Sequence, residues 1–318
     1  MRIFIAGATG VVGRRLVPQL IDAGHEVTAV VRAAGKRETV SRQGARPVHV
    51  DLFDAVALRA AVAGQDAVIN LATHIPPSSR AFLPGAWREN DRIRRVASRN
   101  LVDAAIAGGA ARFVQESFAP IYPDRGDEWI DEGTPVRAAR YNRSVLDAEA
   151  AAARLTRSGR TGVVLRFALF YGPDSSFTLD TISYVRKGWA PALGAPDGFV
   201  SSVSHDDAAT AVVAALAARA GIYNVVDDEP MRRRDYYGSL AAALGVAPPK
   251  FPPAWLARVT GSLGETLSRS QRISNRKLKE ESGWRPATRS VRDGWPHIVA
   301  ATASVGRSEQ VAESATTR

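Results

Sequence analysis

Three glycines near the start of the chain have the spacing of a loop that binds a diphosphate. Gly7, Gly10 and Gly13 stand between an apolar run at 3–6 and an amphipathic stretch at 14–23. The first glycine permits a tight turn, the second lets the backbone approach a pyrophosphate, and the third lets a helix pack closely on a strand. The free N–H groups and the positive dipole end of that helix would bind the phosphates. Because the loop joins a strand to a helix, it predicts a binding site for a nicotinamide dinucleotide.

Basic residues after the second expected strand favour NADP(H) over NAD(H). The strand Val27–Val31 is followed by Arg32, at the position where NAD-specific enzymes usually carry an acidic residue for the ribose 2′-hydroxyl. A guanidinium there, with Lys36 and Arg37 close behind, would suit a 2′-phosphate. The alternative is an ordinary surface arginine in an arginine-rich chain.

Alternating strands and helices predict the scaffold that positions these residues. Helical stretches separate short apolar segments, and glycines stand near the expected helix ends. This alternation favours an α/β fold, a Rossmann-type doubly wound parallel sheet with helices on both faces. Strands are expected at Arg2–Ala6, Glu26–Val31, Pro47–Val50, Ala67–Leu71, Arg112–Gln115 and Gly162–Phe167, and a last one at Gly221–Val226 could return to the main sheet.

The rhythm of the sequence changes after about residue 170. Glycine and proline become frequent around 188–198, and helices are expected at about 206–219, 231–244 and 254–268. We expect an NADP(H)-binding Rossmann domain over residues 1–170 and a smaller, interleaved C-terminal substrate lobe over residues 171–303. The polar composition of residues 304–318 predicts a disordered tail.

Composition and charge exclude several functional classes. The 318 residues include no cysteine, and the five histidines lack the paired spacing of a zinc site, so no metal site is expected. The formal charge of +10 raises nucleic acid as a partner, but it is spread over single arginines. No run approaches a membrane span, and the chain begins directly with a strand. We expect a cytoplasmic protein with a small-molecule substrate and no nucleic-acid or membrane partner.

Further motifs follow one another along the chain: Asn70–Thr73, Ala97–Asn100, Leu165–Arg166 with Phe170–Pro173, His205–Ala209, Gly221–Val226 and Lys277–Pro286. Together with the loop Gly7–Gly13, they resemble the extended short-chain dehydrogenase/reductase superfamily, in its NAD-dependent epimerase/dehydratase group. The resemblance covers nearly the whole chain. It implies a dinucleotide cofactor, a substrate lobe whose role varies, and a possible homodimer through helices around residues 86–107 and 139–157.

The cofactor contacts are expected in the loops that follow the strands. Asp51 and Leu52 follow the third strand, where they would contact adenine. The full set of expected cofactor-binding residues is Gly7, Thr9, Gly10, Val11, Val12, Gly13, Arg32, Asp51, Leu52, Leu71, Ala72, Thr73, Tyr141 and Leu169.

The catalytic motif of the family is only partly present. Its members use a tyrosine as general acid or base, and a lysine one helical turn later lowers the pKa of that tyrosine. Tyr141 matches the tyrosine, but Val145 holds the lysine position, Phe118 the Ser/Thr position and Arg94 the position of a supporting asparagine. Arg143 or Arg94 could replace the missing charge. A phenol without a nearby cation is a poor base at neutral pH, so transfer of a hydride to an already electrophilic acceptor, such as an enone or iminium, would need less acid–base help.

The catalytic candidates are Tyr141, Ser117 and His74, and each has a simpler alternative. Tyr141 is the expected acid. Ser117 could reach the substrate if the loop shifts by one residue, or it is a strand-end serine with a structural partner. His74 could be an acid or substrate ligand, or a solvent-facing loop residue. Glu116 is either a site carboxylate or a buried partner of an arginine, and Tyr122 either lines the substrate cleft or only packs.

Two functions fit this pattern. The first is an NAD(P)H-dependent oxidoreductase, or an epimerase or isomerase, acting on a small organic or sugar-like molecule with non-standard catalytic residues. The second is a non-catalytic sensor or regulatory protein that binds NADP(H).

Overall fold

The computed structural model describes the backbone of residues 1–253 and 255–316, without the side chains of residues 258 and 304–316. Of the tail expected to be disordered over residues 304–318, the backbone of 304–316 is described as the end of a helix, and residues 317–318 lie outside the described residues. The disorder of this tail stays a prediction.

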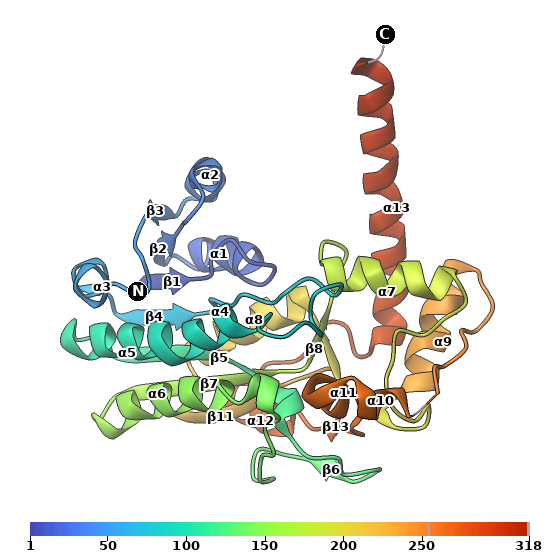
Figure 1. Cartoon of the computed structure of the whole chain (residues 1–318). Coiled ribbons are helices and arrows are strands. Elements are labelled where there is room, and N and C mark those ends of the chain that lie inside the picture. Colours follow the sequence, from blue (N-terminus) through green and yellow to red (C-terminus); the bar gives the residue numbers. More distant parts are fainter. Residues whose placement is uncertain (254, 317–318) are drawn as a thin grey trace.

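Seven parallel strands form the central sheet (Figure 1). Their order is β11-β7-β5-β4-β1-β2-β3, and each neighbouring pair is parallel. This is the doubly wound arrangement that the sequence predicts, and the last strand does return to the main sheet. The strands are β1 (Arg2–Ala6), β2 (Glu26–Val30), β3 (Arg46–Val48), β4 (Ala67–Asn70), β5 (Arg112–Phe118), β7 (Thr161–Phe167) and β11 (Gly221–Val225).

Helices cover both faces of the sheet. Helices α1 (Gly13–Asp22) and α8 (His205–Ala215) pack on one face, and α3 (Ala55–Val62), α5 (Ser98–Ala107) and α6 (Val145–Arg157) pack on the other. The side chains of a strand alternate between these two layers, as they must at a period of two: Ile3 and Ile5 belong to the first, Phe4 and Ala6 to the second.

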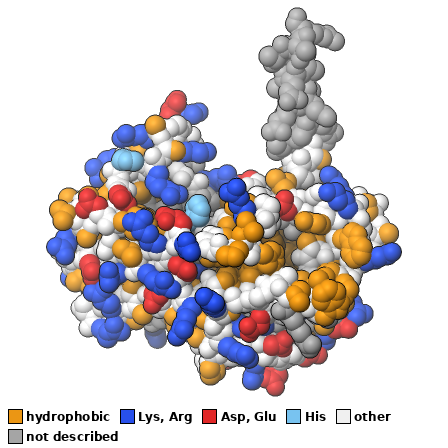
Figure 2. All heavy atoms as spheres, in the orientation of Figure 1, with side chains coloured by type: hydrophobic (Ala, Val, Ile, Leu, Met, Phe, Trp, Pro, Cys, Tyr) orange, Lys and Arg blue, Asp and Glu red, His pale blue; other side chains and the backbone are white. Residues whose placement is uncertain are grey.

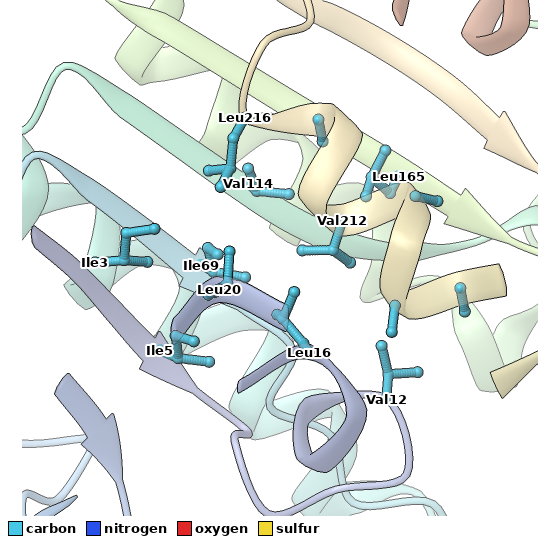
Figure 3. Packing of buried hydrophobic residues seen from close by; sticks show 14 of the residues in the cluster. Ile3, Ile5, Val12, Leu16, Leu20, Ile69, Val114, Leu165, Val212 and Leu216 are labelled. Carbon is cyan, nitrogen blue, oxygen red and sulfur yellow. The ribbon is translucent and has the colours of Figure 1, made fainter. Parts of the chain in front are cut away.

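The first layer is seen from close by in Figure 3. Leu16 and Leu20 of α1 and Val212 of α8 pack against the strand residues Ile69 and Leu165. Full burial of each such side chain contributes roughly 1.5–3 kcal/mol. This packing fixes the start of α1 against the ends of the strands.

The direction of winding reverses between β1 and β4. Strands β2 and β3 lie on one side of β1, whereas β4, β5, β7 and β11 lie on the other. In open α/β sheets, ligands bind at the carboxyl ends of the strands at such a reversal. The loops after β1 and β4 are therefore the place to look for a site.

Beside the main sheet, the described residues form a smaller apolar cluster and three short two-stranded sheets. Tyr171, Ile182, Tyr236, Leu240 and Trp295 form the centre of the cluster. The short sheets pair β8 (Leu169–Tyr171) with β10 (Ser202–Ser204), β9 (Phe199–Val200) with β12 (Met231–Arg232), and β6 (Trp129–Ile130) with β13 (Arg272–Ile273). The last pairing joins segments far apart in the sequence.

The remaining elements connect these layers. Three expected helices are divided: 86–107 by a π-helical turn, 139–157 into a short 3-10 turn and an α-helix, and 254–268 at Gly261, whose φ is +66°. The elements are η1 (Ala34–Lys36), α2 (Arg37–Arg42), α4 (Arg88–Arg92), η2 (Ile93–Ala97, the π turn), η3 (Ala119–Ile121), η4 (Arg140–Asn142), α7 (Ser176–Arg186), α9 (Arg233–Leu244), α10 (Leu256–Val259), α11 (Gly261–Ser268), α12 (Arg276–Ser282) and α13 (Val291–Thr316).

Charged side chains of both signs are interspersed on one face of the molecule (Figure 2). Figure 2 shows Lys and Arg scattered among Asp and Glu on this face, while hydrophobic side chains gather toward its middle and right. Among the residues that the structure describes, no helix combines the length and apolar character needed to cross a membrane.

Candidate functional site

The loop between β1 and α1 is shaped by its glycines. Gly7 has a φ of +88°, and a Cβ on it would lie 2.5 Å from the carbonyl carbon of Leu71. A Cβ on Gly13 would lie 2.2 Å from the oxygen of Gly7. No side chain tolerates such contacts, so only glycine lets the loop pass this close to the end of β4 and lets α1 pack against the loop. The loop therefore has the form that the sequence predicts.

The start of helix α1 is free to accept an anion. Its N-cap is Val12, which forms no side-chain capping bond, and its first turn holds no acidic residue. The loop is closed from within by a hydrogen bond from the amide of Gly10 to the oxygen of Gly7, at 3.1 Å. The helix start thus keeps the N–H groups and dipole that suit a diphosphate. These features of the loop are those expected of a dinucleotide-binding loop.

The exit of β4 is fixed by a buried asparagine. The amide nitrogen of Asn70 donates to Ser98 at 3.1 Å and to Gln115 at 3.0 Å, and its oxygen accepts from the backbone of Ala72 at 3.1 Å. These bonds hold the half-buried residues 71–73 beside Gly7. The cofactor was expected near this exit, but Asn70 was expected only as part of the motif Asn70–Thr73 and not as the residue that fixes the loop.

The expected adenosine-binding residues follow β2 and β3. Arg32 is exposed, and Asp51 accepts a local hydrogen bond from the backbone of Phe53 at 2.9 Å. The carbonyl oxygen of Leu52 accepts from Asn100 at 3.2 Å. Leu169, also expected at the cofactor, is half-buried on β8. Each of these four residues comes after the carboxyl end of a strand of the main sheet, and these ends share one edge of the sheet.

Tyr141 and Val145 lie on the turn η4 and at the start of α6. Tyr141 is half-buried, and its ring lies edge-on to Trp87 with the centroids 5.0 Å apart. Burial raises the pKa of the phenol above its ordinary value, although the charge of Arg94 opposes this. The phenol therefore stays protonated at neutral pH and can donate a hydrogen bond, but it cannot act as a base. Val145 is fully buried at the lysine position. The contact of Trp87 with Tyr141 was not foreseen, because an isolated tryptophan in a loop carries no motif.

Ser117 is part of a buried polar network. The residue is buried, and its hydroxyl donates to Glu149 at 2.5 Å. Glu149 also receives Arg166 in a two-pronged contact of 2.8 and 2.7 Å. This gives Ser117 a structural partner, which is the simpler of its two expected roles. The next residue, Phe118, is half-buried.

Tyr122 does not line a cleft. Its side chain is fully buried, and its hydroxyl accepts from Arg166 at 2.8 Å and donates to Asn224 at 2.9 Å. The expectation that it lines the substrate cleft is wrong, because the turn η3 directs it inward between β7 and β11. Its role is the packing role named as the alternative.

Glu116 pairs with Arg94, as its second interpretation proposed. Both residues are buried, and Arg94 Nη2 lies 3.3 Å from Glu116 Oε1. Within the described chain, Arg94 Nε and Glu116 Oε2 have no hydrogen-bond partner. The pair thus keeps one free donor and one free acceptor, in a buried place where such groups are rare.

His74 is exposed, in the loop after β4. Its backbone N–H donates to Asn90 at 2.9 Å, and this bond fixes the loop. The imidazole ring takes no part in the bond. The structure thus brings Tyr141, Trp87 and Arg94 together, whereas Ser117 belongs to the network around Glu149.

A charged cluster joins the start of α1 to the C-terminal half. Arg15 contacts Asp174 at 2.9 Å and Asp206 at 2.7 Å, and His205 Nδ1 lies 3.1 Å from Asp174. Burial lowers the pKa of His205 to about 4, helped by the charge of Arg15. The imidazole is therefore neutral at pH 7. The cluster ties the dinucleotide loop to the segments around β8 and β10.

Comparisons with known proteins agree with this geometry. A family profile described as NAD(P)H-binding matches residues 7–219, well over half of the chain. A 3-diazoavenalumate denitrifying reductase of a Streptomyces species is 33% identical over 305 residues, which cover 92% of this chain and 99% of the relative. A relative in Stigmatella aurantiaca, named a 4-hydroxy-2-methyl-3-oxo-4-farnesyl-3,4-dihydroquinoline-1-oxide ketoreductase, is 28% identical over 285 residues, 85% of this chain and 81% of its own.

The fold is shared with solved structures. A human epimerase family protein determined with NADPH superposes with a TM-score of 0.78 at 22% sequence identity, covering 94% of this chain and 99% of its own. At this identity the likeness concerns the fold. It confirms the Rossmann-type α/β architecture expected from the sequence.

Proposed function

Because the chain belongs to the extended short-chain dehydrogenase/reductase superfamily, in its NAD(P)-binding epimerase/dehydratase group, we propose that it is an NADP(H)-dependent reductase of an aromatic diazonium acid. One observation carries the proposal: the two side chains that would move or tune protons in this family are hydrocarbon here. Val145 is fully buried at the lysine position, and Phe118 is half-buried at the hydroxyl position. The favoured reaction is one that needs no proton from the enzyme.

The proton balance separates the acceptor classes. Reduction of a ketone places a hydride on carbon and a proton on oxygen, so it needs an acid at that oxygen. An aromatic diazonium ion takes up a hydride, its C–N bond breaks, and dinitrogen leaves with the two electrons of that bond. Arene and dinitrogen are formed with no proton taken up or released. The nicotinamide cofactor, when bound, supplies the hydride.

The relative with 33% identity supports this acceptor class. It is named a denitrifying reductase of 3-diazoavenalumate, a diazo compound that is also an acid anion by its name. The cationic form of a diazo group is a diazonium ion, and aromatic diazonium ions persist in water far longer than aliphatic ones. Trp87, edge-on to Tyr141, offers an aromatic surface for such a ring. The protonated phenol of Tyr141 would orient the ligand as a hydrogen-bond donor.

The preference for NADP(H) rests on Arg32. Among the side chains that the structure describes, none pairs with its exposed guanidinium, and Lys36 and Arg37 follow in η1 and at the start of α2. An exposed cation after β2 suits a 2′-phosphate, whereas a ribose 2′-hydroxyl would call for a carboxylate.

Turnover of matched acceptors by the wild type and by Tyr141→Phe tests the proposal. The purified protein is mixed with NADPH and either an aromatic diazonium acid, a β-keto acid or an enone, and both NADPH oxidation and dinitrogen are measured. We expect oxidation with the diazonium acid, equimolar dinitrogen, and a loss of no more than about tenfold in Tyr141→Phe, since no general acid is removed.

Two other outcomes would replace this function. Turnover of the ketone alone, abolished in Tyr141→Phe, would make the chain a ketoreductase like its 28% identical relative. Tight NADPH binding with no oxidation by any acceptor would favour the non-catalytic sensor.

A further inference from the structure

The helix that carries Arg94 runs alongside the segment that carries Tyr141 and Val145. Three contacts fix their register: Trp87 meets Tyr141 ring to ring, Ser144 donates to Asp91 at 2.6 Å, and Arg95 contacts Asp147 at 3.1 Å. Arg94 and Val145 both lie in the interval between the second and third contacts. The neighbouring helix therefore carries a cation in the same interval in which Val145 stands at the lysine position.

The π-helical turn directs Arg94 inward. Residues Ile93–Ala97 form this turn between α4 and α5. The side chain of Arg94 is 4% exposed and reaches β5, whereas that of Arg95 is 55% exposed and faces α6 at the surface. Single π turns inside α-helices occur frequently at functional sites. Here the turn separates a buried arginine from an exposed one.

A second buried ion pair in the same protein shows what a purely structural pair looks like. Arg166 and Glu149 have the same side-chain exposures as Arg94 and Glu116, 4% and 10%. Arg166 nevertheless binds Glu149 through two bonds of 2.8 and 2.7 Å, while Arg94 makes one contact of 3.3 Å. The loose pair keeps Arg94 Nε and Glu116 Oε2 unpartnered. The charges of Arg94 and Glu116 therefore neutralise each other less completely than those of Arg166 and Glu149.

We propose that Arg94, held by Glu116, is a positioning residue that supplies the positive charge of the active site from the neighbouring helix and acts on the phenol of Tyr141. In the family the cation is a lysine on the same helix as the tyrosine, whereas here it is Arg94 on the neighbouring helix. This inference rests on the proposed function only in placing Tyr141 beside the bound ligand.

Two other arginines considered for this role, Arg269 and Arg143, are less well suited to act on the phenol. Arg269 also acts on Tyr141, but its guanidinium donates to the carbonyl oxygens of Tyr122 and Arg137 and to Glu265. Arg143, the other cation considered from the sequence, is exposed. Arg94 thus combines burial, register with Val145 and a free N–H.

The ionisation of a more acidic tyrosine at position 141 tests this directly. We would insert 3,5-difluorotyrosine there in the full chain, without cofactor, and follow its pKa by fluorine NMR. Glu116→Gln leaves Arg94 unopposed and should lower this pKa by about one pH unit, whereas Arg94→Gln with Glu116→Gln should raise it above the starting value by a similar amount. The double variant leaves no unpaired buried charge and is therefore expected to fold.

Arg95→Gln is the matched control. It removes a neighbouring charge that is exposed and paired with Asp147, so the pKa at position 141 should not move. Equal pKa values in Glu116→Gln and in the double variant would overturn the proposal, because Arg94 would then have no effect on the phenol. This readout needs no substrate, so it decides the inference even if the proposed reductase activity fails.

A double-mutant cycle tests the same link during turnover. With Tyr141 present, Arg94→Gln with Glu116→Gln should lower kcat about threefold to tenfold at unchanged NADPH affinity, and Arg94→Lys should retain most of the rate. In a Tyr141→Phe background the double substitution should have no further effect. The same loss in both backgrounds would show that Arg94 acts by another route and would contradict the proposal.

Discussion

The hydroxyl group of Ser117 donates a 2.5 Å hydrogen bond to the carboxylate of Glu149, in the interior of the protein. The serine adjacent to the altered catalytic position is therefore held by helix α6. Ser117→Ala should lower the free energy of unfolding by about 1.5–3 kcal/mol, the usual range for a hydrogen bond to a charged group, and leave kcat within about twofold. Chemical denaturation and steady-state kinetics check this. The exposed Ser158, bonded only to the carbonyl of Leu155, is the control. A large loss of kcat in a stable Ser117→Ala protein would restore Ser117 as a catalytic candidate.

Gly13→Ala should abolish tight NADPH binding. The added methyl group would lie 2.2 Å from the oxygen of Gly7, so the loop or the start of α1 must move. We expect the affinity, followed by NADPH fluorescence, to fall at least about tenfold, or about 1.4 kcal/mol. Gly238→Ala serves as control, because a Cβ there meets nothing within 4 Å. Normal binding by Gly13→Ala would mean that the dinucleotide lies elsewhere.

Arg32→Asp should reverse the cofactor preference. Loss of a charged hydrogen bond to the 2′-phosphate costs about 1.5–3 kcal/mol, which is roughly a tenfold to hundredfold loss of NADPH affinity. NADH affinity should stay the same or improve. Competitive titration with both cofactors measures this, with the exposed Arg59 on α3 as the control position. Unchanged NADPH affinity would leave Arg32 an ordinary surface arginine.

The stability of the protein should fall between pH 6.5 and pH 4 because of His205. The pKa of this buried imidazole is about 4 in the folded chain, against 6.5 in the unfolded one. Below pH 6.5 His205 is protonated in the unfolded state but stays neutral in the folded state. The stability that the neutral buried imidazole allows is therefore present in full above pH 6.5 and is lost as the pH approaches 4. The loss is about 3 kcal/mol. The free energy of unfolding, measured by denaturation at several pH values in this range, should depend less on pH in His205→Asn than in the wild type. An equal pH dependence in both proteins would assign the effect to other groups.

The sequence predicted the elements whose signal is local. The spacing of its glycines identifies the loop, and short apolar runs identify the strands. The bounds of the sheet strands and the start of α1 were therefore predicted to within a few residues. Strand β5 runs three residues further than expected, to Phe118, because Glu116 and Ser117 are polar and look like the start of a loop. Their burial depends on Arg94 and Glu149, which lie on other elements.

Long-range partners could not be predicted. The pairing of β6 with β13 joins residues more than 140 positions apart, and neither segment is long or apolar enough to be recognised as a strand. Tyr122 shows the same limit, since its motif position gave no indication of Arg166 and Asn224. The π turn that buries Arg94 leaves no compositional trace. The homodimer through α5 and α6, the cytoplasmic location and the boundary near residue 170 stay predictions.

Transfer of a labelled hydride shows whether the protein reduces an aromatic diazonium ion. The protein is mixed with an aromatic diazonium acid and NADPH that carries deuterium at the transferable position of the nicotinamide ring, and the product is analysed by mass spectrometry and NMR. We expect one deuterium on the ring carbon that bore nitrogen, with one dinitrogen released for each NADPH oxidised. A product that retains both nitrogen atoms, or that carries hydrogen from water at that carbon, would contradict it.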